Sequence, residues 1–433
     1  MDLLFYLLVF LLVLIVSSTT NKLLPFMPMP LIQILLGVGI GLFLPNNQYH
    51  LDTELFLALV IGPLLFREAQ ESDITSILKH WRIVLFLIFP VIFISALSIG
   101  GMAHILWASL PLAACVAVGA ALGPTDLVAF ASLSERFSFP KRISNILKGE
   151  GLLNDASGLV AFRMALIAWT TGTFSLTQAG SSLAISIVGG FVVGFLTAMV
   201  NRFLHTFLLS VRATDIASEL LLELSLPLLT FFIAEEIHVS GIIAVVVAGI
   251  LKASRFKKIN LLEAQVDTVT ETVWHTVTFM LNGSVFVILG MELELIAEPF
   301  LKISFYNTLL LFLSIFLLTI LLFAIRFLMI YGFYAVRIKK LQKSLHNYVK
   351  DMLLLTFSGV KGTVSIATIL LIPSNLEQEY PLLLFLVAGV TLLSFLTGLL
   401  VLPYLSEEEK PSSDKLMHIA ILNAVAVELE KDL

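Results

Sequence analysis

Residues 121–130 read ALGPTDLVAF and lie inside a long apolar stretch, 105–131. Pro124 has no backbone N–H and its ring clashes with the preceding turn, so a regular helix does not continue through this position. Asp126 places a carboxylate inside the same apolar stretch, where a charge is costly and usually functional. The stretch therefore predicts a membrane helix that is interrupted by a short segment carrying one negative charge.

A second apolar stretch, 351–372, is interrupted in a similar way. Its centre reads SGVKGT at 358–363, with two glycines around Lys361. Glycine weakens a helix, and the lysine places a positive charge at the break. The sequence thus contains two charged breaks of opposite sign within otherwise apolar stretches.

The composition indicates an all-α membrane protein with many spans. Of 433 residues, 58% are hydrophobic and 13% are charged, and the mean hydropathy is +0.99. This leaves too little polar surface to cover a water-soluble globule. A helix needs about 20 apolar residues to cross a bilayer. Thirteen stretches are predicted to cross: 3–17, 24–44, 54–66, 83–100, 105–131, 145–169, 181–203, 217–235, 239–252, 271–291, 305–335, 351–372 and 381–404.

The basic residues support this division of the chain, because lysine and arginine collect on the cytoplasmic side of a membrane. Most of the 26 lysines and arginines fall in alternate connections and in the tail after the last stretch. The opposite connections contain only Lys302, and Arg163, Arg326 and Lys361 lie inside apolar stretches. The pattern predicts an N-terminus outside the cell and a C-terminus in the cytoplasm.

The two breaks lie in the fifth and twelfth stretches, which are predicted to cross the membrane in opposite directions. This arrangement is typical of an inverted repeat, with the first six stretches corresponding to the eighth to thirteenth. The half-helix ends would then meet near the middle of the membrane, where Asp126 and Lys361 neutralise opposing helix dipoles. A harmless kink is the alternative for one Gly-Pro pair, but two charged breaks in matching positions favour an ion site.

The sixth stretch contains EGLLNDAS at 150–157, and its Asp155 is the first candidate for an ion carrier. Proton-coupled transport needs a group that binds either a cation or a proton, and a partly dehydrated carboxylate does both. The alternative for Asp155 is a structural hydrogen bond at a helix start. Glu150 and Asn154 share a helix face. Arg326 needs an anion, and Glu150 is the leading candidate for a structural pair.

The other charged residues near apolar stretches have less certain roles from sequence alone. Arg163 lies two turns beyond the candidate carrier and has no evident partner, so it is expected either to pair or to extend toward the membrane surface. Glu223, Glu235, Glu236 and His238 lie near predicted helix ends and are expected to be interfacial.

Five segments, in this order and spacing, resemble the monovalent cation:proton antiporter-1 family of sodium/proton exchangers. The resemblance extends over about residues 50–400. The segments are GPTDLVAF at 123–130, EGLLNDASGLVAF at 150–162, AEEIHVSGIIAVVVAGI at 234–250, FMLNGSVFVILGMEL at 279–293 and FSGVKGTVSIA at 357–367.

The resemblance implies a homodimer in which a core domain moves across the bilayer relative to a dimerisation domain. It also implies a set of site residues: the cation and proton carrier Asp155, its neighbours Asn154, Thr125 and Asp126, and a stabilising ion pair of Glu150 and Arg326. Na⁺, as the transported ion, would bind at Asp155 and Asp126. The Asn-Asp pair, in place of two aspartates, goes in this family with electroneutral exchange of one cation for one proton.

Three residues depart from the family pattern. Leu127 replaces the usual proline after Thr-Asp, Lys361 replaces an arginine, and Gly151 stands where some members have serine. Lysine keeps the charge of arginine but lacks its planar fork of donors, so the hydrogen bonds at the second break must differ. The family's Phe-Glu segment appears here as LFRE at 65–68, so its carboxylate is left unassigned.

The expected function is antiport of Na⁺ or Li⁺ against H⁺ across the cell membrane, without enzymatic activity, cofactor or nucleic-acid partner. Residues 1–404 are expected to form the transmembrane exchanger domain and 405–433 a short cytoplasmic tail. K⁺/H⁺ antiport is the alternative substrate. A cation channel gives no role to the paired broken helices. An intramembrane protease would use Asp126 and Asp155 as its catalytic pair, a role that the Asn154 and Gly-Pro surroundings fit less well than transport.

Overall fold

Every regular secondary-structure element in the part of the chain that the computed structural model describes is a helix, which confirms the predicted all-α class. The described residues are 2–24, 27, 29–43, 53–72, 74–126, 129–130, 139–172, 176–211, 215–253, 261–301, 305–341, 348–369, 371–372 and 380–406. The predicted tail after residue 406 lies outside them.

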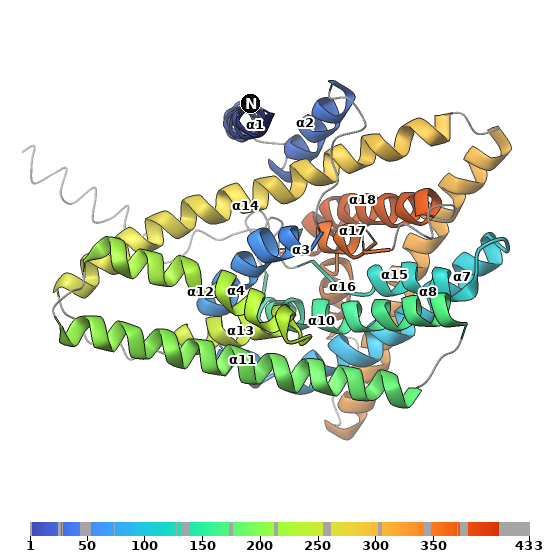
Figure 1. Ribbon diagram of the computed structural model, residues 1–433. Coiled ribbons are helices and arrows are strands. Elements are labelled where there is room, and N and C mark those ends of the chain that lie inside the picture. The colour runs from blue at the N-terminus through green and yellow to red at the C-terminus, as the bar shows by residue number, and fades with distance from the viewer. Residues whose placement is uncertain are drawn as a thin grey trace, which may run out of the picture.

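The helices follow one another along the chain as Figure 1 shows. They are α1 (Asp2–Leu23), α2 (Met29–Phe43), α3 (Thr53–Phe56), the π-helix η1 (Leu57–Ile61), α4 (Gly62–Glu71), α5 (Ile74–Leu78), α6 (Trp81–Phe86), the π-helix η2 (Leu87–Val91), α7 (Ile92–Leu106), α8 (Leu112–Ala121), α10 (Lys141–Thr171), α11 (Leu176–Ser210), α12 (Ile216–Glu236), α13 (Gly241–Ala253), α14 (Leu261–Leu301), α15 (Phe305–Leu341), α16 (Val349–Phe357), α17 (Thr363–Ile369) and α18 (Tyr380–Leu405).

Each of the thirteen apolar stretches coincides with one of these helices or with consecutive ones. Within the described residues, seven helices are long and apolar enough to cross a membrane. The others coincide with the shorter apolar α1, α2, α8 and α13 or with the interrupted runs α3–η1–α4 and α16–α17. The predicted segmentation is confirmed.

Prolines explain where two of the spans become π-helical. Pro90 lies inside η2, and Pro63 is in the first turn of α4, directly after η1. A proline cannot donate to the carbonyl four residues earlier and its ring crowds that carbonyl. A wider turn removes the conflict: after η1, the amide of Gly62 donates to the carbonyl of Leu57, five residues back.

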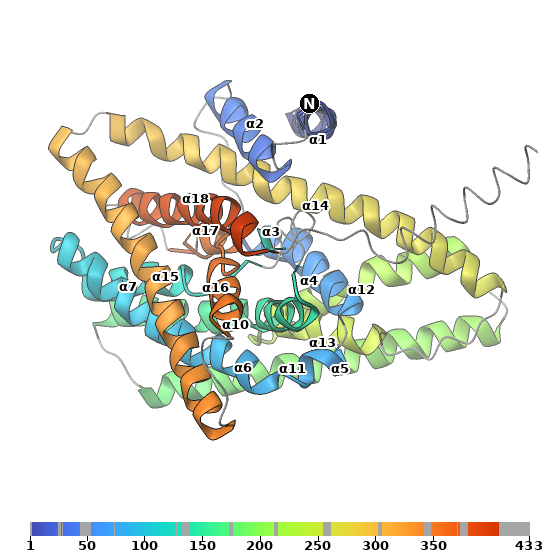
Figure 2. The ribbon, with the colours of Figure 1, turned by 180° about the vertical axis from the view of Figure 1, so that it is seen from behind.

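The helices pack in two groups. The α14 group contains α1, α2, α4 and α11–α14, in which α14 packs along α2, α11 packs on α13, and α13 packs on α4. The α10 group contains α6–α8, α10 and α15–α18, in which α7 packs on α8, α8 on α10 and α15 on α18. α10 lies at the centre of the bundle, where it also contacts α13 and α4 (Figures 1 and 2). The division matches the two-part architecture that the family resemblance implies.

Glycine permits the close approach of α2 and α14. A Cβ on Gly290 would overlap the backbone carbonyl of Ile34, and a Cβ on Gly37 would overlap that of Val287. Small residues are a general way to bring membrane helices together, because van der Waals contact replaces the missing hydrophobic drive.

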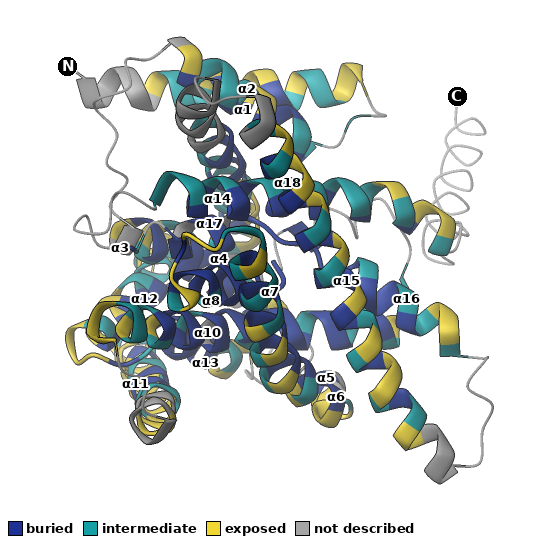
Figure 3. Ribbon diagram, turned by 90° about the vertical axis from the view of Figure 1, so that its right-hand side faces the viewer, coloured by how far each residue is buried: buried dark blue, intermediate teal, exposed yellow. Residues whose placement is uncertain are grey.

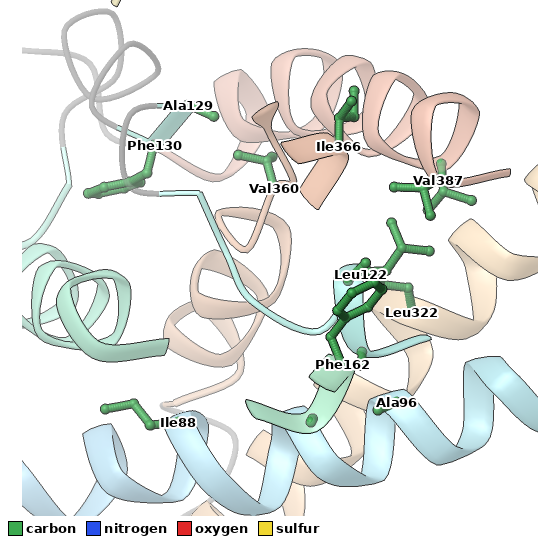
Figure 4. Packing of buried hydrophobic residues seen from close by; sticks show 14 of the residues in the cluster. Ile88, Ala96, Leu122, Ala129, Phe130, Phe162, Leu322, Val360, Ile366 and Val387 are labelled. Atoms are coloured by element: carbon green, nitrogen blue, oxygen red, sulfur yellow. The ribbon is translucent and has the colours of Figure 1, made fainter. Parts of the chain in front are cut away.

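Buried residues concentrate where α8, α10 and α17 meet (Figure 3). Leu122 and Val360, from the two breaks, are fully buried in one apolar cluster with Phe162 of α10 and Leu322 of α15 (Figure 4). Large apolar side chains on the outside of the bundle, such as Phe203 of α11, are exposed as expected for lipid-facing surfaces. The broken helices are therefore held inside a packed apolar shell.

Candidate functional site

The two breaks cross each other. α8 ends at Ala121 and α16 ends at Phe357, and the chain after each helix is not helical. At the crossing the amide of Asp126 donates to the carbonyl oxygen of Val360 at 3.0 Å. The two interrupted spans predicted from the sequence are thus joined directly, backbone to backbone.

Lys361 satisfies the carbonyl oxygens exposed at the end of α8. Its Nζ donates to the carbonyl oxygens of Gly123 and Pro124, both at 2.7 Å. The backbone amide of Lys361 donates to Ser394 Oγ of α18 at 3.1 Å. A helix C-terminus is negative, so the ammonium group offsets its dipole as the sequence suggested.

The glycines on either side of Lys361 leave room for two functional side chains. A Cβ on Gly362 would overlap the carboxylate of Asp126, and a Cβ on Gly359 would overlap the guanidinium of Arg326. Both contacts are tighter than any side chain allows. The SGVKGT sequence therefore does more than weaken a helix, because it admits an anion and a cation close to the backbone.

Asn154 connects α10 to the first break. Its Nδ2 donates to the carbonyl oxygen of Thr125 at 2.8 Å and to Thr125 Oγ1 at 2.7 Å. Thr125 Oγ1 in turn donates to Glu150 Oε1 at 3.0 Å. One hydroxyl thus accepts from the amide and donates to the carboxylate, which fixes the position of the Thr125 backbone beside α10.

Glu150 and Arg326 form a bidentate ion pair. Arg326 Nη1 and Nη2 donate to Glu150 Oε1 and Oε2 at 2.6 and 2.8 Å, and Arg326 Nε donates to the Leu355 carbonyl at 3.0 Å. Only 1% of Glu150 and 3% of Arg326 is exposed. Such parallel N–H···O bonds are the strong form of this interaction. The pair is the one suggested by the sequence, and its stabilising role stays a prediction.

Asp155 and Asp126 line one small pocket between the two helix groups. It is also lined by Ile61, Leu64, Leu65, Glu68 and Val364, and its volume is about 10 Å³, close to the room that one water molecule needs. Asp126 Oδ1 accepts from the amide of Ala129 at 2.9 Å. Asp155 is 5% exposed, and its Oδ1 has no hydrogen-bond partner among the described residues. The pocket therefore holds a buried carboxylate oxygen with spare acceptor capacity.

Glu68 is a pocket residue that the sequence reasoning left unassigned. Arg67 stands between Phe66 and Glu68, so the family's Phe-Glu pair is not present as adjacent residues and Glu68 could not be matched to it. The signal was present in the spacing: Ile61, Leu64 and Glu68 recur at helical intervals, and all three line the pocket.

The structure shows the partners of two charges outside the pocket, which the sequence left open. Arg163 is not unpaired, since its Nη2 lies 3.7 Å from Glu235 Oε2. Glu223 is 9% exposed, with Oε1 accepting from Gln70 at 2.8 Å and Oε2 lying 3.3 Å from Lys252 Nζ, and its interfacial position stays a prediction. These partners lie on other helices, and the relative rotation of two helices does not follow from a local sequence pattern.

Comparison with known proteins places the chain in a family. The family profile described as "Sodium/hydrogen exchanger, transmembrane" matches residues 7–407, nearly the whole chain. The protein belongs to the sodium/hydrogen exchanger family. The match contains both breaks, the Asn154-Asp155 pair and the pocket, so the family resemblance drawn from the sequence is confirmed.

Two relatives in the sodium/hydrogen exchanger family come from Bacillus. The chain is 35% identical over 401 residues to the "Sodium, potassium, lithium and rubidium/H(+) antiporter" of Bacillus pumilus, and 34% identical over 414 residues to the protein of that name from Bacillus subtilis. The alignments cover 91% and 94% of this chain but 60% and 62% of the relatives. The chain thus spans about three fifths of the length of these relatives.

The fold also matches that of a solved structure. The sodium proton antiporter MjNhaP1 from Methanocaldococcus jannaschii is similar with a TM-score of 0.67, over 93% of this chain and 97% of that one, at 18% identity. At this identity the likeness concerns the fold. With the apolar spans and the family match, it shows that this exchanger-family chain is a multi-pass membrane protein.

Proposed function

We propose that this protein is a secondary antiporter that exchanges a monovalent cation for H⁺, with Na⁺ as the principal cation. The observation that carries the proposal is the pocket carboxylate of Asp155, whose Oδ1 has no partner in the described structure and which lies beside Asp126 at the crossing of two broken helices. Transporters place their ion sites at such crossings, where unwound backbone and half-helix ends meet.

Asp155 would carry the cation and the proton in turn. A carboxylate that binds a proton loses the charge that attracts a cation, so binding of one ion excludes the other. Asn154 holds the Thr125 backbone beside the carrier, and Asp126 supplies a second carboxylate to the same pocket. Glu68, in the last turn of α4, supplies a third carboxylate to the pocket.

One cation is exchanged for one proton if Asp155 is the only group that binds Na⁺ in one direction and H⁺ in the other. Asn154 carries no charge, and replacing H⁺ by Na⁺ on a single carboxylate leaves the charge of the moving site unchanged. Asp126 already accepts from the Ala129 amide and is assigned a supporting role. The proposed antiport is therefore electroneutral.

Na⁺ is the proposed principal ion, with Li⁺ accepted and K⁺ as the alternative. The family profile that matches the chain is described as a sodium/hydrogen exchanger, which supports Na⁺ as the first candidate. The printed names of the Bacillus relatives include sodium, potassium, lithium and rubidium, which supports transport of more than one alkali cation.

The positions of the basic residues support an N-terminus outside the cell and a C-terminus in the cytoplasm. The family resemblance supports a homodimer in the cell membrane. Transport needs no bond-making chemistry, so enzymatic activity and a cofactor are not part of the proposal.

The test is ion exchange by the purified protein in liposomes that contain a pH-sensitive dye. After a proton gradient is imposed, Na⁺, Li⁺, K⁺ and choline are added in turn. Na⁺ and Li⁺ should dissipate the gradient, and the apparent KM for Na⁺ should rise as the pH falls, because protons compete for the carrier. The Asp155→Asn variant should lose exchange.

The control is Asp351→Asn, which removes a carboxylate of α16 that lies 3.6 Å from Arg142 and away from the pocket. This variant should keep ion exchange. Exchange by Asp155→Asn at the wild-type rate, or no response to any alkali cation, would contradict the proposal, whereas a preference for K⁺ would select the alternative substrate.

A further inference from the structure

Arg163 and Glu235 connect the two helix groups side chain to side chain. Arg163 belongs to α10, the helix that also carries Asp155, and Glu235 belongs to the last turn of α12 in the α14 group. Arg163 Nη2 lies 3.7 Å from Glu235 Oε2, with 51% and 30% of the two side chains exposed. The pair is thus accessible at the surface rather than part of the packed core.

The α12–α13 turn holds Glu235 in place. Its Oε1 accepts from the backbone amide of Gly241, the first residue of α13, at 3.1 Å. His238 has a positive φ of 58°, which is uncommon for a residue with a side chain, and its amide donates to the Glu235 carbonyl at 2.9 Å. One carboxylate oxygen is therefore committed to α13, and the other faces Arg163.

The ion pair and the pocket lie toward opposite ends of the bundle. At one end, called here the basic end, α4 and α13 finish and α10 and α12 begin. Gly249 of α13 lies against Phe66 of α4, Lys252 of α13 pairs with Glu223 of α12, and Gly149 of α10 lies against Ile77 of α5, the helix after α4. Glu68 brings the pocket toward this end. Arg163 and Glu235 lie toward the other end, where α10 and α12 finish.

We propose that Arg163 and Glu235 form a latch that closes the far side of the transporter while the pocket faces the basic end. An antiporter must present its site to the two sides in turn, which requires one helix group to move against the other. A contact that joins the groups on the far side must open when the site turns to that side. The latch rests on the proposed antiport function and adds a gate to it.

The expected effect is a shift of population, not a loss of ion affinity. Neither residue lines the pocket. An ion pair that is partly exposed changes an equilibrium between two states by about two- to fivefold. Loss of the pair should therefore change the exchange rate by a factor in this range, with less change in the apparent KM for Na⁺.

Thiol labelling from each side of the membrane tests the latch without requiring transport. A cysteine replaces Val364 in the pocket, and the natural Cys115, which is fully buried, is replaced by alanine. Vesicles of both orientations receive an impermeant maleimide. The start of α16 lies at the basic end, because Asp351 is 3.6 Å from Arg142 at the start of α10. A separate protein with Lys350→Cys, at the exposed start of α16, identifies the vesicles that present this end.

Glu235→Gln is the sharpest variant, because the amide oxygen still accepts from Gly241 while the charge is lost. Glu235→Gln and Arg163→Gln should each lower the ratio of labelling from the basic end to labelling from the far end by about two- to fivefold. Arg163→Lys, which keeps the charge of the partner and leaves Glu235 on the Gly241 amide, should give a ratio close to that of the unmodified pair.

Asp351→Asn is the matched control. It removes the Arg142–Asp351 pair, which has a similar length of 3.6 Å and similar exposure, but joins α10 to α16 within one helix group. This variant should leave the labelling ratio unchanged. An unchanged ratio in both Gln variants, a ratio that rises, or an equal fall in Asp351→Asn would overturn the latch. If labelling shifts as expected while liposomes show no cation exchange, the proposed antiport function is wrong, but the ion pair still controls which side of the membrane the pocket faces.

Discussion

Glu150 and Arg326 meet in two parallel hydrogen bonds of 2.6 and 2.8 Å, although 176 positions separate them in the sequence. Both are almost fully buried, and Thr125 of the first break donates to the same carboxylate. The pair therefore joins α10 and α15 to the backbone that carries Asp126.

Removal of one partner should destabilise the fold strongly. In Arg326→Met or Glu150→Ala, the remaining charge is left buried without its counter-ion, which costs about 3–5 kcal/mol. The double variant Glu150→Gln with Arg326→Met should be more stable than Arg326→Met alone, because no charge remains. Unfolding of purified protein in detergent measures this. The half-exposed Arg142→Gln serves as the control and should cost less than about 1 kcal/mol. Equal losses at the two arginines would argue against a structural role for the buried pair.

Much of this architecture was predictable because membrane spans and charges within them leave strong signals in one sequence. Apolar length gave the spans, and the two breaks were visible as Gly-Pro and as glycines around Lys361. Asp155 and Asn154 were recognisable as polar residues in a hydrophobic stretch. The structure adds how they meet: Asn154 donates to Thr125, while Lys361 donates to carbonyl oxygens at the end of α8.

The contacts that sequence did not reveal are those between helices far apart in the chain. Glu68 was left unassigned because the local order of residues departs from the family pattern. Its spacing from Ile61 and Leu64 puts it on one helix face with them, and the packing of α4 against α10 shows that this face lines the pocket. Arg163 and Glu223 have partners on other helices, whose relative rotation a hydropathy pattern does not determine. Span positions follow from local sequence, whereas pairings depend on tertiary packing.

Lys361→Met should weaken both the fold and transport. The methionine keeps the length of the side chain but removes two charge-assisted hydrogen bonds, so the carbonyl oxygens of Gly123 and Pro124 lose a donor at a cost of about 3 kcal/mol. Lys361→Arg should recover most of the stability, since its planar fork can donate to two oxygens. Thermal unfolding and Na⁺-driven proton flux are the measurements. Similar behaviour of the Met and Arg variants would show that the charge at 361 is not what holds the break.

Gly362→Ala should abolish exchange. The added methyl group would occupy the position of the Asp126 carboxylate, and the non-helical backbone next to it is fixed by the hydrogen bond from the Asp126 amide to the Val360 carbonyl. Gly332→Ala on α15 is the matched control, because a Cβ there meets no atom within 4 Å. It should keep activity and gain up to about 1 kcal/mol from helix propensity. Flux in liposomes, after both proteins are shown to be folded, checks this; an active Gly362→Ala protein would exclude a need for close approach.

Asp215 caps the N-terminus of α12 and predicts an acid-sensitive contribution to stability. Hydrogen bonds from Ser218, including its amide at 2.8 Å, lower the pKa of Asp215 below its ordinary value. The contribution is then complete above the pKa of the unfolded chain and is lost as the pH falls through the lower pKa of the folded protein. Asp215→Asn keeps a capping oxygen without the charge, so its thermal stability should change less than that of wild type between pH 7 and acid pH. Identical acid profiles would show that the charge of this cap is unimportant.

Glu223 should anchor α4, the helix that brings Glu68 to the pocket. Its carboxylate accepts from Gln70 of α4 and pairs with Lys252 of α13, whose Nζ also donates to Asn201 at 3.2 Å. Glu223→Ala removes the group on which these contacts converge and should cost about 2–3 kcal/mol, somewhat less than a fully buried pair because both side chains retain slight exposure. Glu223→Gln keeps an oxygen for Gln70 and should cost less.

A role of Glu223 in positioning α4 would also change cation affinity, because Glu68 would move relative to Asp155. The apparent KM for Na⁺ in liposomes should therefore rise in Glu223→Ala and change less in Glu223→Gln. The control is His205→Gln, which removes a pair with Glu219 on α11 and α12 that does not include α4. If Glu223→Ala lowers stability but leaves the apparent KM at the wild-type value, the network holds the α14 group together without setting the geometry of the pocket.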